Sequence, residues 1–207
     1  MTQYPHLANF KSVEGYWNDR NIFREIIKDI LNKTAAKNML EIGFNIGYSA
    51  SMWLEFDINN RLKLTSVDIG KHKDTEAAAR AVKGLHGDRF EFILCDSKKV
   101  KPQLLGKRFD LAFIDGDHGH EGVCNDINLC LDLEIPYLVF DDWHPKEDDY
   151  NAVRDSADEI FKLKLTRLRL YDVEGHKSKV ALYRNDTTYS SKNTLSGQVS
   201  LLSPKSV

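Results

Sequence analysis

Short apolar segments alternate with longer helix-forming ones along most of this chain. Five of the short segments lie at residues 38–42, 62–67, 90–94, 109–114 and 137–140. Each has the length of a strand, and the run at 109–114 is apolar almost throughout, as expected for a strand covered on both faces. The alternation predicts a mostly parallel sheet with helices on both faces, because parallel neighbours need crossover connections.

The segments between the expected strands carry apolar or alanine-rich patterns at helical spacing. We expect helices at residues 21–36, 46–54, 75–85, 121–133 and 149–161. Two further strands are expected at residues 165–171 and 179–184, and the polar residues 172–175 between them predict an antiparallel hairpin. The expected fold class is therefore α/β, a doubly wound, mostly parallel, seven-stranded sheet that ends in an antiparallel hairpin.

Composition indicates a single folded domain. The chain has 207 residues, of which 42% are hydrophobic and 29% charged, enough apolar material for one core. We expect an N-terminal helical segment at residues 1–36, the main domain at 37–184 and a disordered tail at 185–207, where polar residues dominate. The formal charge of −2 provides no basic excess for general nucleic-acid binding.

Cysteine spacing and the N-terminal sequence bear on the compartment. The three cysteines form no C-x-x-C pair, so we expect reduced thiols rather than a zinc ribbon or a disulfide framework: Cys95, Cys124 and Cys130. The chain begins without a basic and apolar leader, and no segment approaches the roughly 20 apolar residues that span a bilayer. A cytoplasmic protein without a membrane anchor is expected.

A carboxylate stands at or beside the end of each of the first five expected strands. These acids are Glu41, Asp68, Asp96, Asp115 and the pair Asp141–Asp142. The carboxyl ends of parallel strands meet at one edge of the sheet, where such folds bind ligands. Acids that served only solubility would be scattered over both edges, so the pattern favours a functional cleft.

The first strand is followed by the sequence Glu41-Ile42-Gly43-Phe44-Asn45-Ile46-Gly47. A dinucleotide site would need G-x-G-x-x-G, but Asn45 replaces the middle glycine, and Glu41 would repel a pyrophosphate. A cationic ligand without phosphate fits better, and S-adenosylmethionine carries a sulfonium and an ammonium. Asp68 could accept hydrogen bonds from its ribose hydroxyls, and Asp96 from its adenine amino group.

These residues together resemble class I S-adenosylmethionine-dependent methyltransferases, over residues 37–184. The likeness rests on E-x-G-x-x-x-G at Glu41–Gly47, the acid Asp68, the pair Asp96–Ser97 and the terminal hairpin. It implies a Rossmann-like fold and a cofactor site. The implied cofactor contacts are Glu41, Gly43, Phe44, Asn45, Gly47, Ser49, Asp68, Asp96, Ser97 and Asp115.

Two motifs resemble one branch of that superfamily. They are IDGDHGHEGVCNDI at residues 114–127 and VFDDWH at residues 139–144. The branch contains small metal-assisted O-methyltransferases, including some that act on sugars of natural products, and relatives of the cephalosporin-hydroxylase type. The resemblance implies Mg²⁺ or another divalent cation held by Asp115, Asp141 and Asp142, which suits hard oxygen ligands.

His118 is the candidate general base, and Asp115 and His118 are the candidate catalytic residues. The bound cation would lower the pKa of the acceptor hydroxyl, and an imidazole titrates near neutral pH. Alternatively, His118 caps or packs the helix that follows it. His144 is a weaker candidate for catalysis and is read as a loop residue.

Departures from the branch affect the acceptor more than the cofactor. His120 replaces a frequent tyrosine, and residues 133–136 lack the glycines that many relatives have before the fifth strand. No segment after the hairpin could form a lid, so only the N-terminal segment could cover the acceptor. Its aromatic residues could also be core packing, the reading that we favour: Tyr16, Trp17 and Phe23.

The expected function is methyl transfer from S-adenosylmethionine to a hydroxyl of a small molecule, a sugar or a phenol. A nucleic-acid methyltransferase is the first alternative, although the chain lacks a D/N-P-P-[YFW] tetrapeptide and a basic excess. A binding protein that keeps the fold without turnover is the second. No membrane partner is expected, and the exposed edge of the hairpin provides a place for a homodimer.

Overall fold

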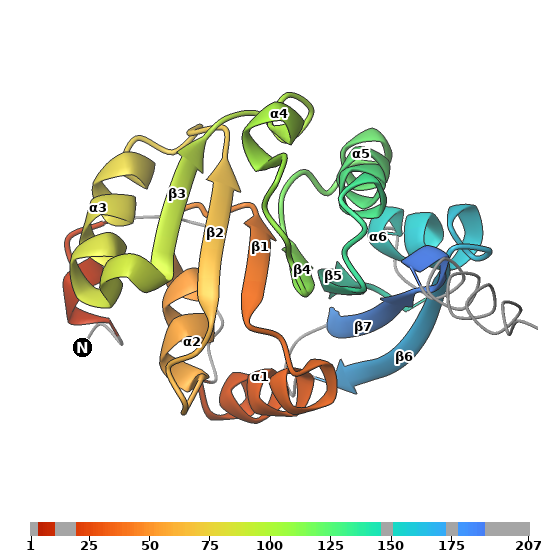
Figure 1. Ribbon diagram of the computed structural model, residues 1–207, viewed down its shortest axis with the longest axis horizontal. Coiled ribbons are helices and arrows are strands. Elements are labelled where there is room, and N and C mark those ends of the chain that lie inside the picture. The colour runs from red at the N-terminus through yellow and green to blue at the C-terminus, as the bar shows by residue number, and fades with distance from the viewer. Residues whose placement is uncertain (1–3, 11–19, 146–150, 173–177, 189–207) are drawn as a thin grey trace, which may run out of the picture.

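The computed structural model describes residues 4–10, 20–145, 151–172 and 178–188. Its centre is one seven-stranded sheet with the order β3-β2-β1-β4-β5-β7-β6 (Figure 1). The first five strands pair in parallel, and β7 is antiparallel to both β5 and β6. The strands are β1 (Asn38–Ile42), β2 (Lys63–Asp68), β3 (Phe90–Leu94), β4 (Leu111–Ile114), β5 (Tyr137–Trp143), β6 (Leu165–Asp172) and β7 (Lys179–Asn185). The expected fold class is confirmed.

A helix follows each parallel strand, although the short one after β3 was not among the expected helices. The helices are α1 (Arg20–Thr34), α2 (Tyr48–Phe56), α3 (Thr75–His86), α4 (Lys101–Leu104), α5 (His120–Asp132) and α6 (Ala152–Arg154), with two 3₁₀ turns, η1 (Pro5–Leu7) and η2 (Gly87–Arg89). None of the helices within the described ranges is long and apolar enough to traverse a membrane.

The helix expected at residues 149–161 is present over residues 152–160, but only its first turn is α-helical. After the short α6, residues 155–160 form a π-helix, η3 (Asp155–Ile160), in which the N–H of Phe161 donates to the carbonyl of Ser156 at 3.0 Å. The widened turn keeps Val153, Ala157 and Phe161 buried. A pattern of apolar residues does not distinguish this wider turn from an α-helix. Residues 146–150 lie outside the described part.

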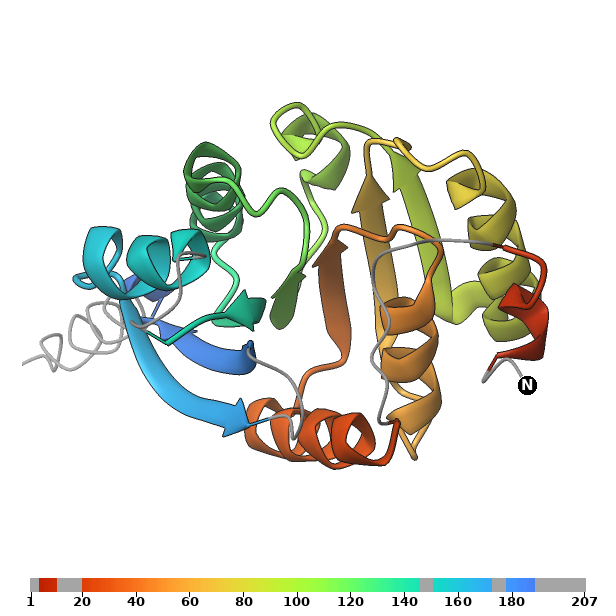
Figure 2. The ribbon, with the colours of Figure 1, turned by 180° about the vertical axis from the view of Figure 1, so that it is seen from behind.

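Helices pack on both faces of the sheet (Figure 1, Figure 2). One hydrophobic core covers each face. The first contains the buried side chains of α1, α2 and α3, with Trp53 on α2 fully buried and 5.7 Å from the ring of Phe113. The second contains those of α4, α5, α6 and η3. Trp53 is therefore a core contact. The three cysteines are free thiols, as expected.

The two ends of the domain can be compared with the expected core packing of the N-terminal aromatic residues and the expected disorder from residue 185. Phe23 on α1 is buried in the first core, whereas Tyr16 and Trp17 lie outside the described residues. At the other end, Asn185 belongs to β7, and its side-chain amide donates to the carbonyl of Ile135 at 3.0 Å. Residues 185–188 therefore pack on the domain, while residues 189–207 are not described. The domain limits otherwise stay a prediction.

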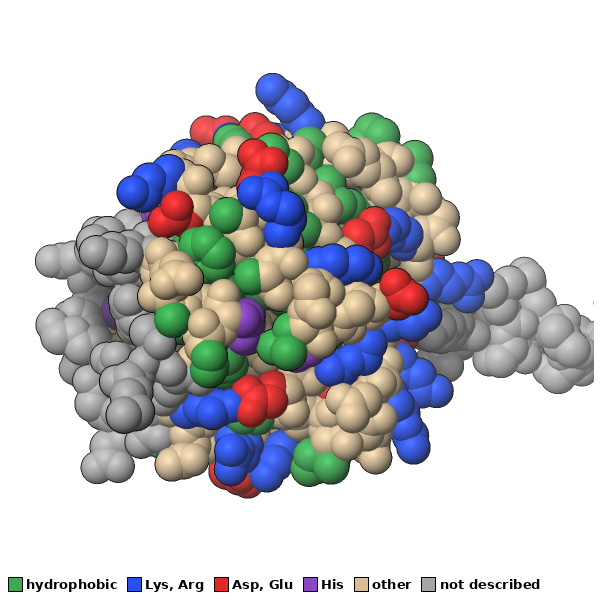
Figure 3. Space-filling model, turned by 90° about the vertical axis from the view of Figure 1, so that its left-hand side faces the viewer, with side chains coloured by type: hydrophobic (Ala, Val, Ile, Leu, Met, Phe, Trp, Pro, Cys, Tyr) green, Lys and Arg blue, Asp and Glu red, His purple; other side chains and the backbone are tan. Residues whose placement is uncertain are grey.

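The surface and the sheet edges bear on partners. On the side of the molecule where α3 lies, basic and acidic side chains are interspersed and do not gather into one basic surface (Figure 3). The strand β6 is one edge of the sheet, as expected for the hairpin. A homodimer at that edge stays a prediction.

Candidate active site

A cavity of about 850 Å³ lies at the carboxyl ends of the parallel strands. The strand order reverses at β1, which pairs with both β2 and β4, so the cavity is at the point where doubly wound sheets bind ligands. Its volume is within the range of small-molecule sites. Every strand-end acid that we expected there except Glu41 contributes to its wall: Asp68, Asp96, Asp115, Asp141 and Asp142.

The loop after β1 approaches the end of β4 so closely that it needs glycine. Gly43 has a φ of 95°, and a Cβ at this position would lie 1.9 Å from the carbonyl oxygen of Asp115. Gly47 has a φ of 82°, and its Cβ would lie 2.6 Å from the ring of Phe44. Asn45, between them, also has a positive φ of 51°. The two glycines therefore shape this part of the cavity wall.

Asp68 holds the same loop in place. Its Oδ2 accepts hydrogen bonds from the backbone N–H groups of Phe44, at 2.9 Å, and Asn45, at 2.8 Å. Its Oδ1 accepts one from the N–H of Gly70 at 2.6 Å. A carboxylate offers about four acceptor positions, so about one remains for a ligand hydroxyl. Asp68 is thus a loop anchor as well as the candidate ribose contact.

Glu41 lies beneath the cavity and does not line it. Its side chain is fully buried, and its carboxyl accepts hydrogen bonds from Ser49 Oγ, at 2.6 Å, and from the hydroxyl of Ser66. Burial raises the pKa of Glu41 to about 8, so at pH 7 it is mostly protonated. The expectation that Glu41 presents a negative charge to the cofactor is corrected, because the side chain points into the core. Ser49, its partner, does line the cavity.

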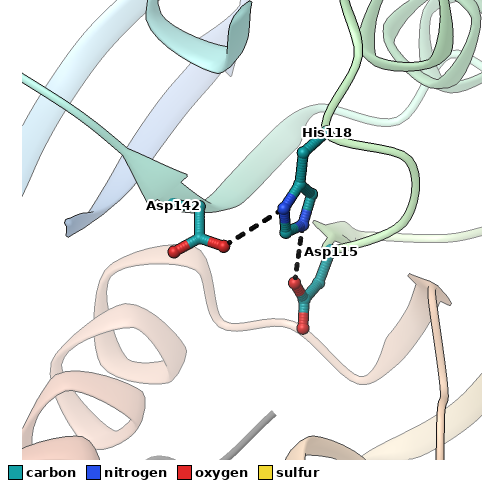
Figure 4. Close-up of side chains that lie close together, drawn as sticks. All are labelled: Asp115, His118 and Asp142. Carbon is teal, nitrogen blue, oxygen red and sulfur yellow. Dashed lines mark ion pairs between the residues drawn. The ribbon is translucent and has the colours of Figure 1, made fainter. Parts of the chain in front are cut away.

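Three side chains after β4 and in β5 form a compact cluster (Figure 4). The imidazole of His118 lies between two carboxylates, with Nε2 3.4 Å from Asp115 Oδ1 and Nδ1 3.3 Å from Asp142 Oδ2. The hydrogen bond to Asp115 raises the pKa of His118 to about 9, and the charge of Asp142 acts in the same direction. Without a cation or substrate, His118 is therefore mostly protonated at pH 7.

A β-bulge aims Asp142 at this cluster. The pairing of β5 with β7 shifts between Phe140 and Trp143, and Asp142 has a φ of 51°. Bulges and strained non-glycine residues of this kind re-aim side chains beside functional sites. One ligand atom each from Asp115, His118 and Asp142 lies within 4.8 Å of the others, close enough together for the three to contact one ion. Asp141 lines the cavity but is not part of that group.

The remaining expected contacts lie on the cavity wall, together with residues that the sequence did not indicate. Ser97 and Asp96 follow β3, and Asp96 Oδ1 accepts from the backbone N–H of Lys98 at 3.0 Å. Other lining residues come from elements far apart in the sequence, and we did not predict a ligand role for them: Lys71, His72, Asp126, Ser178 and Lys179. Phe23, which we placed in the core, also lines the cavity.

Besides the exposed Asp117, which also lines the cavity, Asp126 is an acid that sequence reasoning missed. It is only 1% exposed, on α5, yet it lines the cavity. Burial raises its pKa to about 6, and hydrogen bonds from Ser97 and Asn125 oppose that shift. A signal was present: position 126 falls on the helix face that buries Val123, Ile127 and Cys130, where an acid is unusual.

A second, smaller cavity of about 280 Å³ adjoins the cluster. Its wall is formed by His118 and Asp142, which also line the large cavity, and by His144, Ala152 and Val153. His144 lies in the loop after β5, as expected, and it also lines this cavity. The two cavities meet at the imidazole and the bulged carboxylate.

Comparisons with known proteins agree with this architecture. A family model described as a methyltransferase domain matches residues 40–143, half of the chain. No curated protein sequence matches.

Among solved structures, the SAH-bound methyltransferase PaMTH1 of Podospora anserina has 19% identity and a TM-score of 0.60, over 79% of this chain and 77% of that one. The O-methyltransferase TomG of Streptomyces achromogenes, in complex with SAM, has 16% identity and a TM-score of 0.59, over 79% of each chain. The O-methyltransferase of Bacillus cereus, in complex with SAH, has 16% identity and a TM-score of 0.60, over 86% of each. The chain belongs to the methyltransferase domain family and has the fold of the class I S-adenosylmethionine-dependent methyltransferases.

Proposed function

We propose that this protein transfers a methyl group from S-adenosylmethionine to a hydroxyl of a small molecule, a sugar or a phenol, with a divalent cation. The observation that carries the proposal is the position of His118 and Asp142, which line both the large and the small cavity. Methyl transfer needs a donor and an acceptor whose reacting atoms meet, and a proton-accepting group at their junction. The large cavity would hold the donor and the small one the acceptor.

The large cavity suits a cationic donor. Its wall carries carboxylates from the ends of β2, β3, β4 and β5, and a sulfonium is stabilised by nearby negative charge. The glycines at 43 and 47 allow the ligand to approach the backbone after β1. The remaining acceptor position on Asp68 suits a ribose hydroxyl.

The donor set beside the acceptor cavity fits a divalent cation. Two carboxylates and one imidazole have ligand atoms within 4.8 Å of one another, from Asp115, His118 and Asp142. Asp115 and Asp142 would hold the cation as hard oxygen ligands, with Asp141 close by on β5. When bound, the cation supplies Lewis acidity that lowers the pKa of an acceptor hydroxyl.

His118 would accept the proton that the acceptor hydroxyl loses. Its pKa is raised by Asp115 and Asp142, and this effect would weaken if the two carboxylates held a cation. The neutral imidazole can then take the proton at one nitrogen. Asp142 and Asp115 orient the ring from its two sides, at 3.3 and 3.4 Å. The carboxylates of the cluster therefore have a positioning role in addition to binding.

The test is calorimetric titration of the full chain with S-adenosylmethionine and with its product, S-adenosylhomocysteine, with and without Mg²⁺. We expect binding under both conditions. Methyl transfer from labelled donor would then be measured on a panel of catechols, other phenols and sugars, with EDTA as the matched control. Absence of cofactor binding under every condition would reject the methyltransferase proposal. Full transfer in EDTA would reject the cation and leave methyl transfer intact.

A further inference from the structure

Asp126 is a buried carboxyl at the donor cavity that belongs neither to the glycine loop nor to the Asp115 cluster. Its side chain comes from α5 and is 1% exposed. Across the described residues, no Lys, Arg or His lies within ion-pair distance of it. The polar neighbours are Asn125, whose Nδ2 donates to Oδ1 at 3.2 Å, and the hydroxyl of Ser97. A buried acid without a cationic partner satisfies its oxygens with hydrogen-bond donors.

Asp126 retains acceptor capacity on the side of the cavity. A carboxylate offers about four acceptor positions, and two protein donors are accounted for. Gly116 lies close to this carboxyl, and a Cβ there would be 3.2 Å from Asp126 Oδ2. The wall at this point is therefore formed by the backbone of Gly116, Asp126 and Ser97.

The strand order shows which part of the donor would reach this place. The methyl group must face the junction of the two cavities, at the ends of β4 and β5, where His118 and Asp142 lie. With the ribose at Asp68 after β2, the base continues toward the next strand, β3, and the loop with Ser97. Ser97 is a direct neighbour of Asp126. A donor bound in this way would place its base beside Asp126.

We propose that Asp126 recognises the base of the methyl donor by accepting a hydrogen bond from the 6-amino group of adenine. This inference rests on the proposed use of S-adenosylmethionine. The competing acceptor is Asp96, which is more exposed and whose Oδ1 already accepts from the N–H of Lys98. A buried acceptor distinguishes ligands with and without the 6-amino group more strongly than an exposed acceptor does. When the amino group is missing, neither the ligand nor water satisfies the buried carboxylate.

The experiment compares S-adenosylhomocysteine with its analogue in which hydrogen replaces the 6-amino group, by calorimetric titration of the full chain. We expect the natural protein to bind S-adenosylhomocysteine about tenfold or more tightly than the analogue. In Asp126→Ala, the affinity for S-adenosylhomocysteine should fall to that for the analogue, while the analogue binds as before. A merely structural role would weaken both ligands equally and would overturn the proposal.

Three further variants make the result decisive. Asp132→Ala changes an exposed acid of the same helix, paired with Lys101 at 2.6 Å, and should keep the ratio of the two affinities. Asp96→Ala should also keep the ratio of the two affinities. If Asp96→Ala abolishes the preference for S-adenosylhomocysteine and Asp126→Ala does not, the acceptor of the amino group is Asp96. If Asp126→Ala does not fold, Asp126→Asn must lower the ratio about threefold, because a neutral acceptor bonds more weakly. If the natural protein binds neither ligand, the proposed function has failed rather than this inference.

Discussion

The imidazole of His118 lies 3.3 Å from Oδ2 of Asp142, and this contact joins the loop after β4 to a strained position in β5. The same two residues form the boundary between the large and the small cavity. A proton-accepting ring at such a boundary can reach an acceptor without entering the donor site.

Replacing His118 with alanine should lower methyl transfer by about 10²–10⁴-fold, because general-base catalysis contributes that much to turnover. The affinity for S-adenosylhomocysteine, measured by calorimetry, should stay within about twofold of the natural value. Equal losses of turnover and cofactor affinity would indicate a structural role. A parallel loss of Mg²⁺ affinity would identify His118 as a ligand of the cation rather than the base.

At position 142, the backbone conformation should favour glycine, whereas activity should require the carboxylate of Asp142. Asp142 has a φ of 51°, where glycine is at ease and other residues are strained. The free energy of unfolding of Asp142→Gly, measured by urea denaturation, should therefore be about 1 kcal/mol higher than that of Asp142→Ala. Both variants lack the carboxylate and should lose activity to the same extent. If Asp142→Ala were more stable than Asp142→Gly, the claim that the backbone at position 142 is strained would be wrong.

The close approach of the β1 loop to β4 gives a matched pair of glycine substitutions. Gly43→Ala would place a Cβ 1.9 Å from the carbonyl oxygen of Asp115, so we expect a large loss of stability, about 3 kcal/mol or more, and of cofactor binding. Gly84→Ala, on α3, has no heavy atom within 4 Å of the new Cβ and should stabilise the protein by about 0.5–1 kcal/mol. Circular dichroism during thermal unfolding distinguishes the two.

Glu41 should make stability depend on pH. Burial raises its pKa from 4.5 to about 8, so between these values the unfolded chain loses a proton that the folded protein keeps. The free energy of unfolding should therefore fall as the pH rises through this range. Glu41→Gln keeps the shape and can still bond Ser49 and Ser66, and it should be more stable than the natural protein at pH 8, by a few kcal/mol in order of magnitude. At pH 4.5 the difference should vanish, and a difference independent of pH would contradict the assignment.

Local patterns were sufficient for the elements of the sheet. The strands at residues 38–42 and 90–94 have the predicted bounds, because each run has the length of a strand and is followed by a glycine or a polar turn. The acids at the strand ends lie at one edge of the sheet because parallel strands have their carboxyl ends at the same edge. Five of the six expected strand-end acids line the cavity on that basis alone.

Contacts between distant segments decided the rest. Glu41 points into the core because α2 brings Ser49 over β1, and Asp142 faces His118 because β7 pairs with β5 through a bulge. Asp126 lines the cavity because α5 packs against the loop at Ser97. Side-chain direction, backbone strain and burial all depend on which strand or helix lies alongside, and residues far apart in the chain set these neighbours. The alternation of segments thus implied the sheet and its acidic edge, while the tertiary packing chose which acids face a ligand.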